Sequence, residues 1–112
     1  MPRASLKASP FRKSLAGVPR TLAELRNIGK AMLADFELLG ISSVAKLAAQ
    51  DVDELYLTLC RLTGTRHDPC VHDTFAAAIH QAKTGEALNW WAFTPLRKAR
   101  QQAKTFPLVN VG

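Results

Sequence analysis

Two stretches of this 112-residue sequence hold residue types at spacings that could do chemistry, and the first covers residues 25–30. Its Gly29 lies between two segments with helical apolar spacing, so the chain must reverse there within about four residues and begin a new helix. Asn27 and Gly29 both tolerate left-handed backbone, and Ile28 between them can plug the turn into a core. The free N–H groups at the start of the new helix can bind an anion.

This arrangement is typical of a helix-hairpin-helix that holds the DNA backbone. We expect its DNA-binding residues to be Arg26, Asn27, Ile28, Gly29 and Lys30. The N–H groups of residues 29–32 and the cationic side chains would contact phosphates. Such loops usually carry glycine at both ends of a Gly-x-Gly turn, and here Asn27 replaces the first. Asn adopts left-handed backbone at modest cost, but its side chain can block or replace a phosphate contact.

The second stretch covers residues 66–73 and contains two histidines and a cysteine. A zinc site needs three or four thiolate or imidazole ligands, and His67 with Cys70 supplies two at a plausible separation. Cys60 or His72 would be a third ligand. Because no second paired motif exists and cysteine is more often a small buried hydrophobe, we predict no metal and no other cofactor.

His67 and Cys70 could also form a base–nucleophile pair. The sequence offers no glycine-rich elbow and no evident oxyanion donor, so we predict no catalytic residues and no enzyme activity. The structural interpretation is that Asp68 and Pro69 start a helix, since Asp caps a first turn and Pro suits its first position. The turn would then lock two helices together through a cap and a buried thiol.

The segments around the hairpin predict its two helices. Thr21 and Glu24 form a capping box that would open a short helix through Arg26. The second helix is expected over residues 29–39, with Gly40 just beyond its end. Its apolar positions follow helical spacing: Leu33, Phe36 and Leu39.

Four more helices are expected downstream. A short one follows a cap at Ser42 or Ser43, and the next follows a capping box at residues 51–54 and ends at Gly64. The fifth runs from residue 69 to about 83. The apolar faces of these two longer helices are Val52, Leu55, Tyr56, Leu59, Cys60 and Leu62, and Val71, Phe75, Ala78, Ile79 and Ala82. Nothing alternates with period two, so we expect no sheet.

A sixth helix is expected over residues 96–104, basic on one side and apolar on the other through Leu96, Ala99 and Ala103. Trp90 and Trp91 precede it, beside its cationic residues. They could form a stacking platform for unpaired bases. They could also cover the open end of a small core. We favour the core, because adjacent residues point in different directions and only one of the two could be exposed.

Together these elements predict an all-α fold, a compact five- to six-helix domain with a SAM-domain-like N-terminal half. We expect a basic, flexible arm over residues 1–18 and a single domain over 19–104, followed by a tail over 105–112. The helix-hairpin-helix covers about 21–49 and a helical extension about 51–104. An apolar content of 47% in 112 residues suits one core.

The charge pattern favours an anionic partner. Lys and Arg number 15 against nine Asp and Glu, a net charge of +6. Five acids lie in the middle of the chain, at positions 35, 37, 51, 53 and 54, and favour an alternative, a protein–protein interaction module without DNA contact. Two cysteines, and no apolar signal or membrane-spanning segment, indicate a cytoplasmic chain with no membrane partner. We also expect no small-molecule ligand.

Several runs of the chain match one family over about residues 20–100. The runs are Leu25-Arg26-Asn27-Ile28-Gly29-Lys30, Leu38-Leu39-Gly40-Ile41-Ser42-Ser43-Val44, Glu54-Leu55-Tyr56, Arg66-His67-Asp68-Pro69-Cys70-Val71 and Trp90-Trp91 before Thr94-Pro95. With them the chain resembles small bacterial helix-hairpin-helix proteins labelled "pathogenicity locus protein" or "mitomycin resistance protein". The resemblance implies a compact helical domain similar to those of DNA repair and replication proteins, with DNA binding inferred. The resistance label implies a link to cross-linked DNA.

We therefore expect a DNA-binding accessory protein that contacts the phosphate backbone without reading sequence and is linked to DNA-damage resistance or repair. This mode predicts micromolar or weaker affinity and a salt dependence that reflects only about two to four neutralised phosphates.

Overall fold

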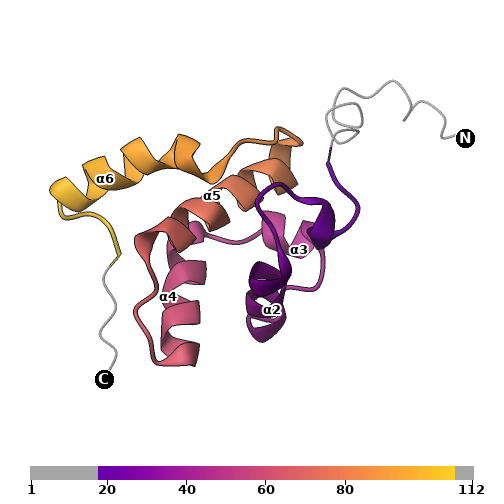
Figure 1. Cartoon of the computed structure of the whole chain (residues 1–112), viewed down its shortest axis with the longest axis horizontal. Helices are drawn as coiled ribbons and strands as arrows, with labels where there is room; N and C mark the ends of the chain where they lie inside the picture. Colours follow the sequence, from indigo (N-terminus) through magenta and orange to yellow (C-terminus); the bar gives the residue numbers. More distant parts are fainter. Residues whose placement is uncertain (1–17, 108–112) are drawn as a thin grey trace, which may run out of the picture.

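The computed structural model describes residues 18–107, which form helices and loops without a strand (Figure 1). The all-α class is therefore confirmed, while residues 1–17 of the expected arm and 108–112 of the expected tail lie outside the described residues. No helix within the described residues combines the length and the apolarity needed to cross a membrane. The elements, with η for a 3-10 helix, are η2 (Leu22–Glu24), α2 (Lys30–Leu38), α3 (Val44–Ala48), α4 (Val52–Thr63), α5 (Pro69–Thr84), η3 (Trp90–Phe93) and α6 (Thr94–Gln102).

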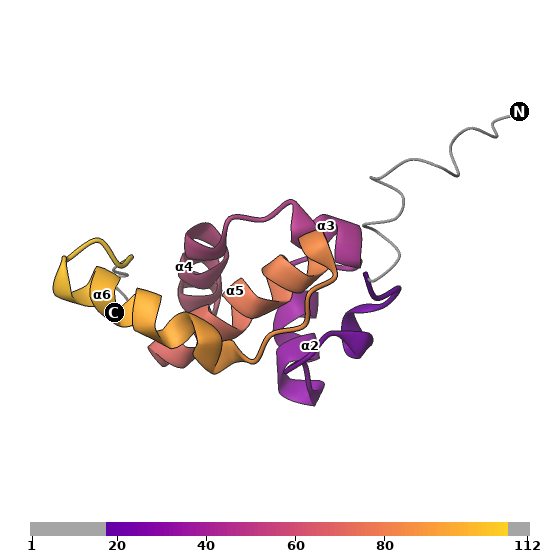
Figure 2. The same cartoon turned by 90° about the horizontal axis from the view of Figure 1, so that it is seen from above.

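Helix α5 is the central element, because α3, α4 and η3 all pack against it. Figure 1 shows α4 and α2 below α5, and Figure 2 shows α6 running alongside the first part of α5 and then beyond it. One core joins these helices, and its largest buried side chains are Phe36, Tyr56, Leu59 and Phe75. Phe36 and Phe75 stack at 5.8 Å between ring centroids, which ties α2 to α5.

Three predicted N-caps are confirmed. The side chains of Ser43, Asp51 and Asp68 each accept a hydrogen bond from a backbone N–H two or three residues on, at 3.1, 3.0 and 2.8 Å. Each satisfies an N–H group that a helix start leaves without a partner. The caps fix where α3, α4 and α5 begin.

The end of α2 also follows the prediction. Gly40 adopts φ +76°, a left-handed conformation that suits glycine. Its N–H donates to the carbonyl of Glu37 at 3.1 Å, and the N–H of Ile41 donates to the carbonyl of Phe36 at 2.8 Å. This Schellman turn returns Ile41 to the core, where it is buried.

The prediction of a first helix through Arg26 was wrong. The chain forms only the three-residue turn Leu22–Glu24, and Thr21 makes no side-chain cap. Glu24 instead accepts the N–H of Arg20 at 3.0 Å. Starting a helix fixes the backbone of several residues for a single hydrogen bond, which costs conformational entropy. The segment before the turn is too short to offset this cost with further hydrogen bonds.

The expected inward sides of two helices were also wrong in part. Leu62, in the last turn of α4, is 54% exposed, because that turn extends below α5 (Figure 1). In α6, Leu96 is 64% exposed and Ala99 and Ala103 are exposed too, whereas Arg97 is buried. Helix α6 thus turns its basic side inward, toward carboxylates on α4 and α5.

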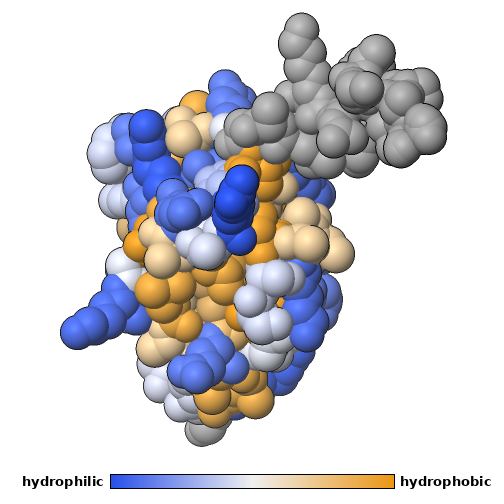
Figure 3. All heavy atoms as spheres, turned by 90° about the vertical axis from the view of Figure 1, so that its right-hand side faces the viewer, coloured by the Kyte–Doolittle hydropathy of each residue, from blue (hydrophilic) through white to orange (hydrophobic). Residues whose placement is uncertain are grey.

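An apolar groove lies on the face formed by η2 and α2. It has a volume of about 540 Å³, and its apolar lining is Leu22, Leu33, Ala34 and Ile41, with Lys30 and Glu37 beside them. A second groove of about 570 Å³ is lined mainly by Val18, Pro19, Val44, Ala45, Ala48 and Ala82. Figure 3 shows apolar surface gathered as a band on this side of the molecule.

Candidate nucleic-acid interface

The turn before α2 is shaped by Asn27, which adopts φ 70° in the left-handed region. Its side-chain Nδ2 donates to the carbonyl of Leu88 at 3.1 Å. Gly29 has φ −109° and ψ −167°, an extended conformation, so Asn27 alone supplies the left-handed step. The Asn27 side chain is thus occupied within the protein and is not aimed at a phosphate.

Two apolar side chains fasten this turn to the core. Leu25 is buried, and Ile28 is half-buried and packs against the core residues. The backbone N–H of Arg26 donates to Oε1 of the buried Gln81 at 2.8 Å. The turn is therefore held by contacts across the fold, and the amide of Arg26 is already bonded.

The start of α2, in contrast, has backbone N–H groups that donate to no described acceptor. Gly29 is its N-cap and no side chain caps it; the first main-chain bond is from the N–H of Leu33 to the carbonyl of Gly29 at 3.0 Å. Within residues 18–107, the N–H groups of residues 29–32 have no acceptor. Gly29 is exposed, and a Cβ added to it would meet no atom within 4 Å. This end of α2 is therefore open to an anion, which the helix dipole also favours.

Two cations flank these open amides. The side chains of Arg26 and Lys30 are exposed, and neither forms an ion pair with any described residue. Lys30 is the first residue of α2 and also lines the apolar groove. Residues 26–30 thus combine backbone donors and mobile positive charge on one exposed turn.

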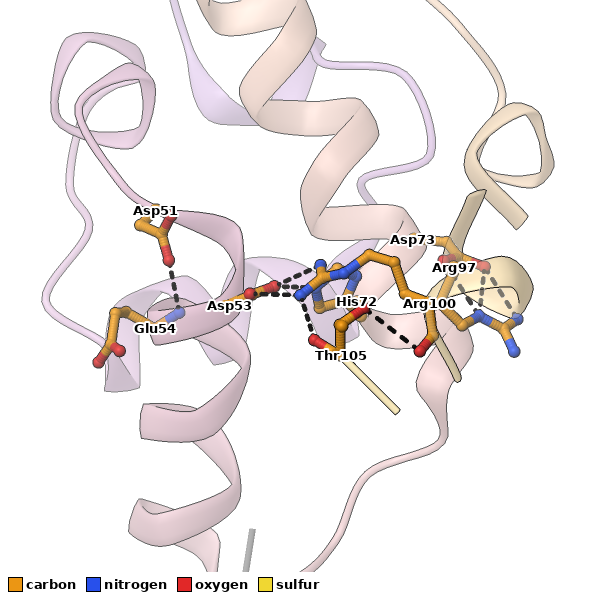
Figure 4. Close-up of polar contacts among 8 residues, drawn as sticks. All are labelled: Asp51, Asp53, Glu54, His72, Asp73, Arg97, Arg100 and Thr105. Carbon is orange, nitrogen blue, oxygen red and sulfur yellow. Dashed lines mark hydrogen bonds and ion pairs between the residues drawn. The ribbon is translucent and has the colours of Figure 1, made fainter. Parts of the chain in front are cut away.

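The arginines of α6 have a different environment (Figure 4). Nη2 of Arg97 lies 3.0 Å from Oδ2 of Asp73, and Thr94 donates to the same oxygen at 2.8 Å. Asp73 is fully buried at 0% exposure. The hydrogen bond to Asp73 raises the pKa of Arg97. This ion pair replaces the apolar contacts expected of α6.

Arg100 forms a second ion pair, with Asp53 of α4. Its two terminal nitrogens lie 3.0 and 2.8 Å from the two carboxylate oxygens, and Nε2 of His72 lies 2.7 Å from one of them. The hydrogen bond from Arg100 is the main reason that the pKa of Asp53 is lowered. Arg100 also donates to the carbonyl of Thr105 at 2.7 Å, which holds the chain end against α6. These two arginines of α6 are therefore held in internal ion pairs.

His67 and Cys70, the candidate metal or catalytic pair, have separate partners. Nε2 of His67 lies 2.9 Å from Oγ1 of Thr63, and its backbone N–H lies 3.5 Å from Sγ of Cys60. The Cys70 thiol lies 3.7 Å from Nη2 of Arg97. The hydrogen bond with Asp68 is the largest cause of the raised pKa of Cys70, which keeps the thiol protonated. Across residues 18–107, no three His, Cys, Asp or Glu side chains converge on a point that could hold a metal.

The two tryptophans differ in exposure. Trp90 is half-buried, whereas Trp91 is 57% exposed. Their rings meet edge to face, with centroids 5.6 Å apart and an interplanar angle of 83°. The core interpretation suits Trp90, and it fails for Trp91.

The sequence reasoning missed the acceptors that organise the fold around this site, namely Gln81 and Asp73. One signal was present for Asp73. It lies between two positions of the apolar face of α5, Val71 and Phe75, and a carboxylate there requires a cationic partner. The strongly basic segment before residue 104 was the natural source of that partner. Gln81 carried no comparable signal.

The sequence of the chain is similar to those of known proteins. Residues 16–99 match the family described as Pathogenicity locus. A protein of Streptomyces lavendulae named "Mitomycin resistance protein McrB" is 40% identical over 77 residues, which cover 69% of this chain and 73% of the relative. No solved structure matches.

Proposed function

We propose that this chain, which belongs to the pathogenicity locus family, is a cytoplasmic DNA-binding accessory protein. In this proposal residues 21–49 act as a helix-hairpin-helix in which the 3-10 helix η2 takes the place of the first helix. Its turn holds the phosphate backbone without reading the bases. In this proposal the protein catalyses no reaction. It binds DNA on which other proteins act.

One observation carries this proposal. The N–H groups of residues 29–32 have no acceptor within residues 18–107, and the exposed side chains of Arg26 and Lys30 stand on the same turn. Backbone donors at a helix start, together with unpaired cations, are the chemistry that recognises a phosphate. The contacts involve no base edge, so they carry no sequence information.

A role in DNA damage is consistent with the relative of Streptomyces lavendulae, which is named as a mitomycin resistance protein. We extend this name to the chain only as part of the proposal. A protein that grips the backbone independently of sequence can act at a lesion whose position is arbitrary, and this suits a response to damaged or cross-linked DNA.

The proposal is tested by DNA affinity, measured by fluorescence anisotropy over a range of salt concentrations. The variant Arg26→Glu with Lys30→Glu reverses both cations of the turn. We expect binding to fall, and the slope of log affinity against log salt to shrink by about two, because each lost phosphate contact removes roughly 0.9 from it. The matched control is Arg61→Glu with Lys83→Glu, which reverses two exposed cations on α4 and α5.

The control variant should lose far less affinity than the hairpin variant, although both change the net charge equally. Equal losses would mean that the net charge, and not the hairpin, governs binding. Unchanged affinity and slope in the hairpin variant would reject the DNA-contact proposal.

A second candidate function, a protein–protein interaction module, is favoured by the apolar groove beside α2. Its lining includes Leu33 and Ile41, and an apolar segment of another chain would fit there. Two of the five central acids that favoured this function have structural roles, since Asp51 caps α4 and Asp53 pairs with Arg100. The substitution Leu33→Gln would weaken such an interaction while leaving the free amides of α2 and the charge of the turn unchanged, so loss of DNA binding in that variant would argue against two separate surfaces.

A further inference from the structure

We propose that Trp91 is a stacking platform for an unpaired nucleobase, so that the preferred ligand is DNA in which a duplex adjoins an unpaired base. This inference rests on the proposed function and deepens it, because the hairpin would hold the backbone while Trp91 takes a base. It assigns a role to a side chain that the core does not use.

The exposure of Trp91 requires an explanation. A large aromatic side chain left 57% exposed gives up much of the free energy that its burial would provide. Its ring is held edge to face by Trp90, which is half-buried in an element packed on α5. A held and exposed indole face loses little conformational entropy when a base stacks on it.

Trp91 follows a segment that is attached to the hairpin turn. The side chain of Asn27 donates to the carbonyl of Leu88, so the segment that leads into η3 is tied to the hairpin turn. Figures 1 and 2 both show the loop after α5 passing beside this turn. Leu88 and Trp91 are three positions apart along the chain, and such a step spans at most about 10 Å between Cα atoms. The segment that carries Trp91 therefore starts beside the turn to which the proposed function assigns the DNA backbone.

Charge around Trp91 supports a nucleic acid. Lys98 follows Trp91 by seven residues, about two helical turns, which places both on the same side of the continuous η3–α6 segment. Lys98 is exposed and forms no ion pair with a described residue, and α6 contains no acid. A basic groove with an aromatic face is the usual means of binding unpaired nucleotides.

A different side of α6 carries Leu96, Ala99 and Ala103, all of which are exposed. This apolar side has no cation at its centre and suits a protein partner better than a nucleotide. Leu96 therefore provides a control for Trp91, since both are large, exposed and apolar and both belong to the η3–α6 segment.

The test compares a blunt duplex with the same duplex bearing a short thymidine overhang, by anisotropy at fixed salt. The wild type should bind the overhang duplex more tightly, and Trp91→Ala should lose that preference, a loss of roughly five- to a hundredfold in affinity for the overhang duplex alone. Trp91→Phe should retain part of the preference, since phenylalanine also stacks. Leu96→Ala should retain all of it.

Other results would overturn the inference in distinguishable ways. If the wild type binds both duplexes equally and the hairpin variant Arg26→Glu with Lys30→Glu binds neither, stacking is wrong and the proposed function stands. If no DNA is bound at all, both are wrong. If Trp91→Ala keeps the preference but changes the mass in solution, measured by light scattering, the indole belongs to a protein contact.

Discussion

The hairpin turn and helix α6 both carry positive charge, and they differ in what faces that charge. Arg97 and Arg100 of α6 are paired with Asp73 and Asp53, so their charge holds the helix in place. The cations at residues 26 and 30 form no ion pair within residues 18–107. Only charge without an internal partner remains available to a phosphate, so the net charge alone does not locate a binding site.

The backbone N–H groups at the helix starts also differ in whether they have a partner within the protein. At α3, α4 and α5 a Ser or Asp side chain caps the helix start, whereas no side chain caps α2. With glycine as N-cap, the start of α2 is less stable than one capped by Ser or Asp by only about a few tenths of a kcal/mol. Under the proposed function an external anion caps this start, and Gly29 leaves open space for it.

The largest effect on stability is expected at Asp73. The substitution Asp73→Ala leaves Arg97 as a buried guanidinium without its carboxylate and removes the acceptor of Thr94. We expect a loss of about 3–5 kcal/mol in the free energy of unfolding, measured with urea. Glu54→Ala, at an exposed carboxylate outside these ion pairs, should change it by no more than about 0.5 kcal/mol. A loss at Asp73 no larger than that would contradict the claim that α6 is held by charge.

On the hairpin side, Asn27 is the sensitive position. Asn27→Ala removes the bond to the Leu88 carbonyl and places a less tolerant residue at φ 70°, which should lower the free energy of unfolding by about 1–2 kcal/mol. Asn27→Gly also loses the bond but relieves the backbone, so it should be the milder change. Equal losses in the two variants would show that left-handed backbone is not what Asn27 provides.

The smallest effect is expected at the partly exposed pair of Arg100 and Asp53. Arg100→Gln should cost about 1 kcal/mol or less near pH 7. Because Arg100 lowers the pKa of Asp53, the stabilisation is present above the ordinary carboxylate pKa of about 4 and is lost as the pH falls through the lowered value. The difference between wild type and variant in urea unfolding should therefore shrink below about pH 4. A difference that grows on acidification would contradict this pairing.

Much of the fold could be predicted because its signals are local. Asp51 and Asp68 mark helix starts, and Gly40 and Gly64 mark helix ends, through geometry that involves only a few neighbouring residues. The orientation of α6 could not be predicted in this way. It depends on Asp73, 24 residues from Arg97 along the chain, and the apolar spacing of α6 indicated the opposite side.

In the candidate site too, some features are indicated by local sequence and others depend on distant contacts. The types and spacing of residues 26–30 indicated a turn with free amides, and the structure has such a turn at the start of α2. The bonds from Arg26 to Gln81 and from Asn27 to Leu88 depend on how distant segments meet, and no local pattern indicates them. The exposure of Trp91 is likewise a consequence of the packing of η3 on α5.

The claim that unpartnered amides at the start of α2 receive a phosphate is tested most directly by amide NMR during titration with a blunt duplex. The account predicts that the largest shifts fall on the amides of residues 29–32 and that the amide of Arg26, already bonded to Gln81, shifts less. If the amides of residues 29–32 stay unshifted while the DNA binds elsewhere, for example along α3, the account is contradicted.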